Sequence, residues 1–133
     1  MAFEFPIRVY YEDTDLAGIV YYANYLKFIE RGRSEWVRSL GVDQARMKAE
    51  TGTVFAVRRV EAEYLKPARY DDELVVSTTL LAETGARIQL AQEVKRAGEV
   101  LFAAQVTLVC LNEAGAAQRI SAEIRRKLAP SLH

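Results

Sequence analysis

The chain has 133 residues, of which half are hydrophobic and 27% are charged, and this size and composition predict one globular domain over residues 1–133. Its 18 acidic and 18 basic residues cancel, which excludes the strong positive field typical of a nucleic-acid-binding protein. No segment is long and apolar enough to span a bilayer, and the first residues lack the basic and apolar regions of a signal peptide. A lone cysteine excludes an internal disulfide, so these features together predict a cytoplasmic protein without a membrane span.

The first half of the chain predicts one strand followed by two helices. Apolar and polar residues alternate over residues 7–12, as they do in a half-buried strand. Residues 23–40 repeat apolar side chains at helical spacing before Gly41, a common helix stop, and residues 42–50 predict a second, shorter helix. The apolar face of the longer helix comprises Leu26, Ile29, Trp36, Val37 and Leu40.

The second half predicts four strands and a final helix. A period of two, with short turns between the apolar segments, marks the strands. They are expected at residues 54–64, 73–82, 88–94 and 100–111. The last strand is apolar on both faces, which favours a central place in the sheet or a place at a subunit contact. Ser121 can cap a helix that runs to Leu128. This order predicts an α+β fold in which an antiparallel sheet curves about the long helix.

Several catalytic chemistries are excluded because the only histidine, His133, is the final residue. Ser-His-Asp and Cys-His hydrolases and histidine-ligated zinc sites all need an imidazole in the body of the domain. The glycine patterns that bind dinucleotides or phosphates are missing, so the sequence predicts no cofactor and no metal. Cys110 lies in an apolar run and is expected to be a buried small hydrophobic residue.

Carboxylates remain, and three of them, Glu12, Asp13 and Asp15, precede the expected start of the long helix. One interpretation is structural, because aspartates in turns often accept hydrogen bonds from nearby backbone N–H groups. The other is catalytic, because the unpaired N–H groups of a helix start can polarise a carbonyl that a carboxylate attacks directly or through water. A thioester suits such a site, since a thiol of pKa ~8.5 leaves without help from an acid. The residues alone do not choose between Asp13 and Asp15.

Other polar side chains near the helix have structural interpretations. Arg33 falls in the apolar face, where an unpaired charge is costly, so it is expected to pair with a carboxylate such as Glu30 or one from the sheet. Tyr21, Tyr22 and Tyr25 are expected either to pack at the helix start or to line a pocket there.

These motifs are similar to those of a known family. The chain resembles the 4-hydroxybenzoyl-CoA thioesterase family of hotdog-fold proteins, and within it the branch encoded beside the Tol-Pal envelope system. The resemblance covers nearly the whole chain. The segments that carry it are residues 11–15 (YEDTD), 18–25 (GIVYYANY), 30–33 (ERGR), 57–59 (VRR), 63–72 (EYLKPARYDD) and 109–110 (VC).

The resemblance implies a hotdog fold, a five-stranded antiparallel sheet wrapped around a long central helix, assembled as a homodimer or homotetramer. It implies acyl-CoA thioester hydrolysis without a metal. The family's catalytic aspartate matches Asp15, and its oxyanion donor, a backbone N–H at the start of the central helix, matches Tyr22. Gly18, Val20 and Tyr21 are then expected to contact the substrate, with the Gly18 N–H as a second donor.

Substrate identity stays open at this point. The Tol-Pal branch typically has histidine where this chain has Tyr22, whereas the 4-hydroxybenzoyl enzyme has tyrosine there. The acyl group, and the choice between CoA and acyl carrier protein, are therefore not fixed by the sequence. An alternative from another class is a module that binds acyl-CoA or acyl carrier protein without hydrolysis. A hotdog dehydratase would need a histidine that the body of this chain lacks.

Overall fold

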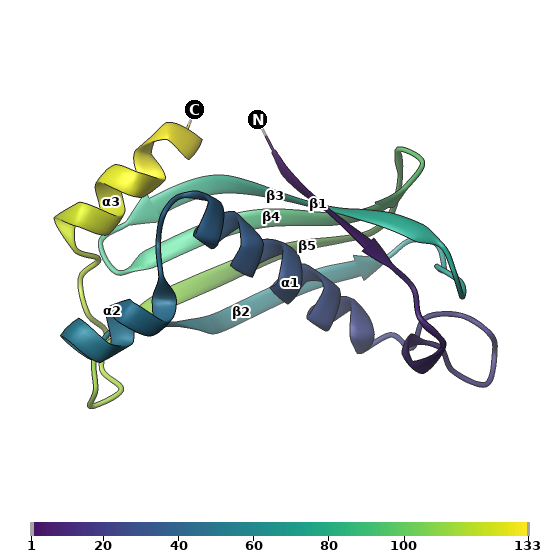
Figure 1. The fold of residues 1–133 in the computed structure, drawn as a ribbon, viewed down its shortest axis with the longest axis horizontal. Helices are drawn as coiled ribbons and strands as arrows, with labels where there is room; N and C mark the ends of the chain where they lie inside the picture. Colours follow the sequence, from purple (N-terminus) through teal and green to yellow (C-terminus); the bar gives the residue numbers. More distant parts are fainter. Residues whose placement is uncertain (1, 133) are drawn as a thin grey trace.

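Five strands form one antiparallel sheet in the order β1-β3-β4-β5-β2, and the long helix α1 lies across one face of it (Figure 1). This computed structural model describes residues 2–132, so His133 lies outside the described residues. The strands are β1 (Phe3–Arg8), β2 (Val54–Tyr64), β3 (Glu73–Thr84), β4 (Arg87–Arg96) and β5 (Glu99–Leu111). The helices are α1 (Asn24–Ser39), α2 (Gln44–Thr51) and α3 (Ala122–Leu128), with short 3-10 turns at η1 (Tyr11–Asp13) and η2 (Ala129–Ser131).

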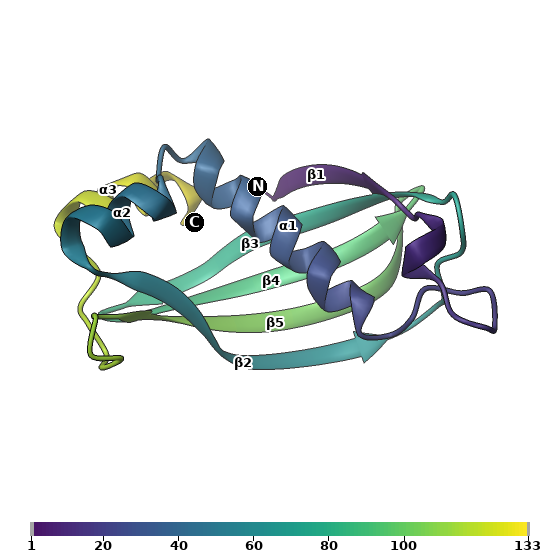
Figure 2. The same ribbon diagram turned by 60° about the horizontal axis from the view of Figure 1, so that its bottom comes forward.

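The predicted α+β architecture is confirmed. Figure 2 shows the sheet curving about α1, while α2 and α3 lie together at one end and the loop before α1 lies at the other. β5, which was expected to be central or at a subunit contact, lies between β4 and β2 and is paired on both sides. A sheet that buries one face against a helix stabilises both elements, because neither could hide its apolar side chains alone.

The first strand was predicted too late in the chain. β1 pairs with β3 from Phe3 to Arg8, whereas the expected strand covered residues 7–12. The chain leaves the sheet after Arg8 because Asp13 closes a turn there: its carboxylate accepts a hydrogen bond from the Tyr10 N–H at 2.8 Å. The alternation of apolar and polar residues did not reveal this turn, because the turn depends on the side chain of Asp13, three residues after Tyr10.

The helix α1 confirms the prediction for residues 23–40, and Ile29, Trp36 and Val37 of the expected apolar face are buried, but the buried face is wider than expected at the start of the helix. Leu26 was predicted to be buried and is 43% exposed. Tyr25 and Phe28 are buried in its place, and Tyr25 stacks on Phe102 of β5 with ring centroids 5.0 Å apart. Aromatic packing of this kind buries large apolar areas and therefore fixes the rotation of the helix against the sheet.

Gly32 lets α1 approach β3 closely. A Cβ added at this position would lie 2.4 Å from the Cγ1 atom of Val76, which is fully buried. Such a distance is well inside van der Waals contact, so only glycine fits between this helix and this strand.

The sequence predicted that Arg33 pairs with a carboxylate, and this prediction is wrong. Its guanidinium donates to the Gln92 side-chain oxygen at 3.1 Å, and among residues 2–132 no carboxylate lies within ion-pair distance of it. The amide group of Gln92 in turn donates to the Ile29 carbonyl and to the Thr78 hydroxyl, both at 2.9 Å. Burial lowers the pKa of Arg33, and the nearby Glu30 carboxylate opposes that shift. A neutral amide thus satisfies part of a guanidinium that was expected to need a charge.

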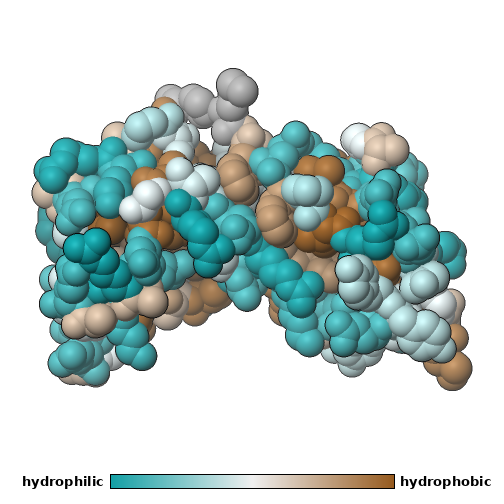
Figure 3. All heavy atoms as spheres, in the orientation of Figure 1, coloured by the Kyte–Doolittle hydropathy of each residue, from teal (hydrophilic) through white to brown (hydrophobic). Residues whose placement is uncertain are grey.

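The remaining elements follow the sequence predictions. β2 contains a bulge between Val57 and Arg59, at the arginine pair that interrupts its alternation. The Ser121 hydroxyl accepts a hydrogen bond from the Ile124 N–H and caps α3. Cys110 is a free, buried thiol, as expected. No helix within residues 2–132 has the length and apolar character needed to cross a membrane. Hydrophilic side chains cover most of the face shown in Figure 3, with apolar areas between them.

Candidate active site

The loop that joins η1 to α1 is folded back on itself by backbone hydrogen bonds. The Asp15 N–H donates to the Ile19 carbonyl at 2.9 Å, and the Gly18 N–H donates to the Asp15 carbonyl at 2.9 Å. Gly18 adopts a φ of +80°, a conformation that disfavours residues with a Cβ. The Tyr21 N–H closes the loop by donating to the Asp13 carbonyl at 2.9 Å. These bonds place the clustered carboxylates beside the start of α1, at the end of the molecule opposite α2 and α3 (Figure 1).

Asp13 has a structural environment. Its side chain is buried, and one carboxylate oxygen accepts the hydrogen bond from Tyr10 described above. Its backbone carbonyl accepts a second hydrogen bond from the Asn24 side-chain amide at 2.9 Å, in addition to that from Tyr21. Asp13 therefore ties η1 to the first residue of α1, which is the local turn role that the sequence had left open for both aspartates.

Asp15 combines a local role with an available oxygen. One carboxylate oxygen accepts a hydrogen bond from the Ala17 N–H at 2.9 Å, as in an Asx turn. Within residues 2–132 its other oxygen has neither a hydrogen-bond partner nor an ion-pair partner. Because Asp15 is partly exposed, this second oxygen can reach a bound molecule or a water.

The start of α1 presents unpaired backbone donors next to this loop. The N-cap position is Ala23, which has no side chain able to cap the helix, and the first turn carries no acidic residue. The N–H groups of Tyr22 and Ala23 have no acceptor in the described part of the chain. Such donors lie at the partially positive end of the helix and favour a developing negative charge.

A small apolar cavity adjoins these donors. It has a volume of about 250 Å³ and includes Val20, Tyr22 and Tyr25, with Tyr64 and the segment after β2 forming its other wall. Of the residues predicted to contact a substrate, Val20 and Tyr22 line the cavity, whereas Gly18 and Tyr21 do not. The full lining is Ile19, Val20, Tyr22, Tyr25, Tyr64, Leu65, Lys66 and Pro67.

Sequence reasoning missed Tyr64. This residue ends β2, and its hydroxyl donates to the Tyr22 carbonyl at 3.0 Å. A separation of 42 residues hides the contact from any local pattern. The only sequence signal was its place in the alternation of the strand, which put it on the same face of the sheet as α1.

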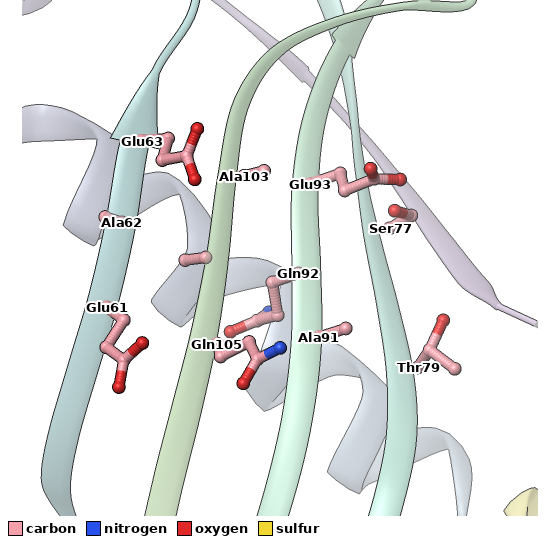
Figure 4. Close-up of a pocket in the computed structure, with 11 residues that line it drawn as sticks. Glu61, Ala62, Glu63, Ser77, Thr79, Ala91, Gln92, Glu93, Ala103 and Gln105 are labelled. Atoms are coloured by element: carbon pink, nitrogen blue, oxygen red, sulfur yellow. The ribbon is translucent and has the colours of Figure 1, made fainter.

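A larger hollow of about 450 Å³ lies on the face of the sheet opposite α1 (Figure 4). Glu61, Glu63 and Glu93 stand around a floor of small side chains that includes Ser77 and Ala103. No helix start reaches this hollow, so its carboxylates have no unpaired backbone donors beside them. Within residues 2–132, neither these three carboxylates nor any other group of His, Cys, Asp and Glu side chains is arranged so that it could hold a metal ion.

Comparisons with known proteins point to one family. The model of the thioesterase superfamily matches residues 17–103. Acyl-CoA thioesterase YbgC of Haemophilus influenzae is 40% identical over 110 residues, which cover 83% of this chain and 81% of that protein. A probable thioesterase from Bartonella henselae has a similar structure, with a TM-score of 0.87 and 34% identity, covering 91% of this chain and 100% of that one. A mutant 4-hydroxybenzoyl-CoA thioesterase in complex with 4-hydroxybenzoyl-CoA shares the fold, with a TM-score of 0.89, 20% identity and coverage of 95% of this chain and 97% of that one.

Proposed function

The chain belongs to the thioesterase superfamily, and we propose that it hydrolyses acyl-CoA thioesters with Asp15 as the catalytic carboxylate and the Tyr22 N–H as the donor to the thioester carbonyl. The observation that carries the proposal is the combination found in one loop. Asp15 keeps an unengaged oxygen and is bonded through its N–H to Ile19, while Ile19 and Tyr22, whose N–H is unengaged, both line the apolar cavity. Together they supply a nucleophile or base, an oxyanion donor and a place for an acyl group.

The chemistry needs few groups. In one route the Asp15 carboxylate attacks the carbonyl carbon and forms a mixed anhydride as the C–S bond breaks and the thiolate leaves; water then hydrolyses the anhydride. In the other, Asp15 takes a proton from a water that attacks the same carbon, and the tetrahedral intermediate expels the thiolate. In both routes negative charge develops on the carbonyl oxygen, where the Tyr22 N–H and the partial positive charge of the helix start stabilise it.

The other residues of the loop have supporting roles in this proposal. Val20 lines the cavity and contacts the acyl group, and Gly18 lets the loop turn tightly beside the substrate. Tyr21 is exposed and does not line the cavity, but its ring lies 5.0 Å from that of Tyr22 and so packs against one of the lining side chains. Exchange of histidine for tyrosine at position 22 leaves the backbone donor in place but changes the wall that meets the acyl group.

The function is tested by measuring thiol release from a panel of short, long and aromatic acyl-CoAs. We expect the protein to release CoA from at least one of them, and the preferred acyl group would define its specificity. A lack of turnover on every CoA ester would contradict the proposal in this form. The same panel on acyl carrier protein would then separate a carrier-specific thioesterase from a non-hydrolytic binding module.

We further propose that the active form is a homodimer joined along β2. This strand lies at the edge of the sheet and pairs only with β5, so a row of backbone donors and acceptors along its 11 residues faces outward. Large apolar side chains are exposed on it and beside it, which is unusual for an unpaired edge. They are Tyr22, Leu26, Val57, Val60, Tyr64 and Leu65. Antiparallel pairing of two copies along β2 would bury these side chains and bring the start of one β2 to the active-site end of the other. A tetramer would be two such dimers.

The proposed location is the cytoplasm, because its reducing conditions keep a free thiol such as that of Cys110 reduced.

The substitution Val60→Lys is expected to convert the dimer into a monomer. It places a charge in the middle of the proposed contact, where desolvation without a partner is costly. Size-exclusion chromatography with light scattering should show the wild type at twice the 15.0 kDa chain mass or a larger even multiple, and the variant at the single mass with reduced thiol release. Leu81→Lys, on the exposed face of the interior strand β3, is the matched control and should keep the dimer. A wild type that is monomeric and fully active would contradict the dimer.

A further inference from the structure

Tyr64 reaches from the sheet to the backbone of the candidate active site. It is the last residue of β2, and its hydroxyl donates to the carbonyl of Tyr22 at 3.0 Å. Tyr22 is also the residue whose N–H is the proposed oxyanion donor. Among residues 2–132, no other side chain donates a hydrogen bond to this carbonyl.

The ring of Tyr64 is held by the aromatic core. Its centroid lies 5.0 Å from that of Phe102 and 5.5 Å from that of Tyr25, both in edge contacts. Phe102 and Tyr25 are buried and stack on each other, so they form a rigid base for Tyr64. The position of the hydroxyl is therefore supported by the packed aromatic rings of β5 and α1, and the ring of Tyr64 also meets that of Tyr22 in an edge contact at 6.1 Å.

The peptide groups on both sides of Tyr22 are consequently fixed. The carbonyl of Tyr21, which shares a peptide plane with the Tyr22 N–H, accepts a hydrogen bond from the Asn24 N–H at 2.8 Å. The carbonyl of Tyr22 itself, in the next peptide plane, accepts the bond from Tyr64. With both planes held, the Tyr22 N–H keeps one direction although nothing in the described chain accepts a hydrogen bond from it. Ala23 provides no side-chain oxygen that could accept from the first N–H groups of α1, so these donors stay available.

We propose that Tyr64 is a positioning residue for thioester hydrolysis, which acts by holding Tyr22 so that its N–H points at the reacting carbonyl. The inference rests on the proposed function, because it concerns the same donor. Tyr64 touches no reacting atom in this role. Its contribution appears when the oxyanion forms, since a preorganised donor costs no rearrangement at that moment.

The hydroxyl remains a donor over the working pH range. Partial burial raises the pKa of Tyr64 above its ordinary value, and the neighbouring phenols of Tyr22 and Tyr25 raise it further. A phenol with a raised pKa stays protonated in neutral and mildly alkaline solution, so its bond to the Tyr22 carbonyl persists there.

The first test is Tyr64→Phe, which removes the hydroxyl and keeps the ring in its aromatic contacts. We expect kcat for the best acyl-CoA to fall about tenfold, less than the ~10²-fold or greater loss seen when an oxyanion donor itself is removed, with KM unchanged. Tyr70→Phe is the matched control. Tyr70 is exposed, its hydroxyl makes no hydrogen bond within residues 2–132, and kcat should not change.

A spectroscopic test separates positioning from a general loss of structure. In the Asp15→Asn background, acyl-CoA labelled with ¹³C at the carbonyl should bind without turnover, and its infrared carbonyl stretch should shift to lower frequency as the Tyr22 N–H polarises it. Adding Tyr64→Phe should move the stretch back toward the value for free acyl-CoA. The melting temperature of each variant reports any structural loss separately.

Two results would overturn the inference, and they differ from failure of the proposed function. If wild type hydrolyses acyl-CoA and Tyr64→Phe retains its kcat, Tyr64 has no positioning role. The same conclusion follows if kcat falls but the carbonyl stretch stays where it is in Asp15→Asn alone. If wild type releases no thiol from any acyl-CoA, the proposed function and this inference are both wrong.

Discussion

Replacing Asp15 with asparagine is expected to reduce kcat for thiol release by about 10²–10⁴-fold, the range in which a positioned base or nucleophile usually contributes. Asparagine keeps the size of the side chain and an oxygen that can still accept the hydrogen bond from the Ala17 N–H, so the loop should retain its shape. What is lost is the charge on the second oxygen, which no other group in the described chain engages. Binding of acyl-CoA should persist, because the cavity and the Tyr22 donor are unchanged.

The measurement compares steady-state thiol release and equilibrium binding of acyl-CoA for wild type, Asp15→Asn and Asp13→Asn. Asp13→Asn is the matched control, since its carboxylate is buried and occupied by the Tyr10 N–H. Asp13→Asn should lower the melting temperature and should reduce kcat far less than Asp15→Asn does. The opposite pattern, with activity lost in Asp13→Asn and kept in Asp15→Asn, would show that Asp13 is the catalytic carboxylate.

Replacing Gly32 with alanine is expected to destabilise the fold although alanine is the better helix former. The new Cβ would lie 2.4 Å from the Val76 Cγ1 atom and 3.0 Å from its Cβ atom, so α1 or β3 must move. Overpacking of this kind costs about 1–3 kcal/mol, against a gain of at most about 1 kcal/mol from helix propensity. Urea denaturation followed by circular dichroism should show a lower midpoint with an unchanged slope.

A double-mutant cycle tests whether the contact with Val76 is the cause. Val76→Ala alone should also destabilise the protein, because it leaves a cavity under the helix. In the double variant the alanine at position 76 makes room for the new Cβ, so the two losses should be smaller together than their sum. Strict additivity of the two losses would place the strain somewhere other than this contact.

Local sequence patterns predicted most of the fold because most of it depends on local periodicity. The four strands after residue 52 and the helix before Gly41 are each at least ten residues long. Each has a regular spacing of apolar residues, and each lies near its predicted bounds. The errors occur where distant residues decide the outcome. β1 is set by its pairing with β3, and the burial of Tyr25 in place of Leu26 is set by Phe102, far along the chain.

The candidate site was predictable in kind but not in detail. Clustered carboxylates before a helix indicated attack on a carbonyl, yet the choice between Asp13 and Asp15 rested on a family resemblance. The structure adds a physical difference between them, because one carboxylate is buried and engaged in a turn whereas the other keeps an unengaged oxygen. Arg33 and Tyr64 show the limit of pattern reasoning. Each has a partner, Gln92 or Tyr22, that only the folded chain brings within reach.

The strand order also determines when the sheet can be completed during synthesis. β3, β4 and β5 follow one another as neighbours and can pair as each leaves the ribosome, but β2 precedes them all and pairs only with β5. Val54 pairs with Leu111, so a long, partly apolar strand stays unpaired until β5 has been synthesised. Closing such a loop late slows folding and exposes the strand to other nascent chains. The edge that would join two finished subunits is therefore also the part of the polypeptide at greatest risk of aggregation before folding ends.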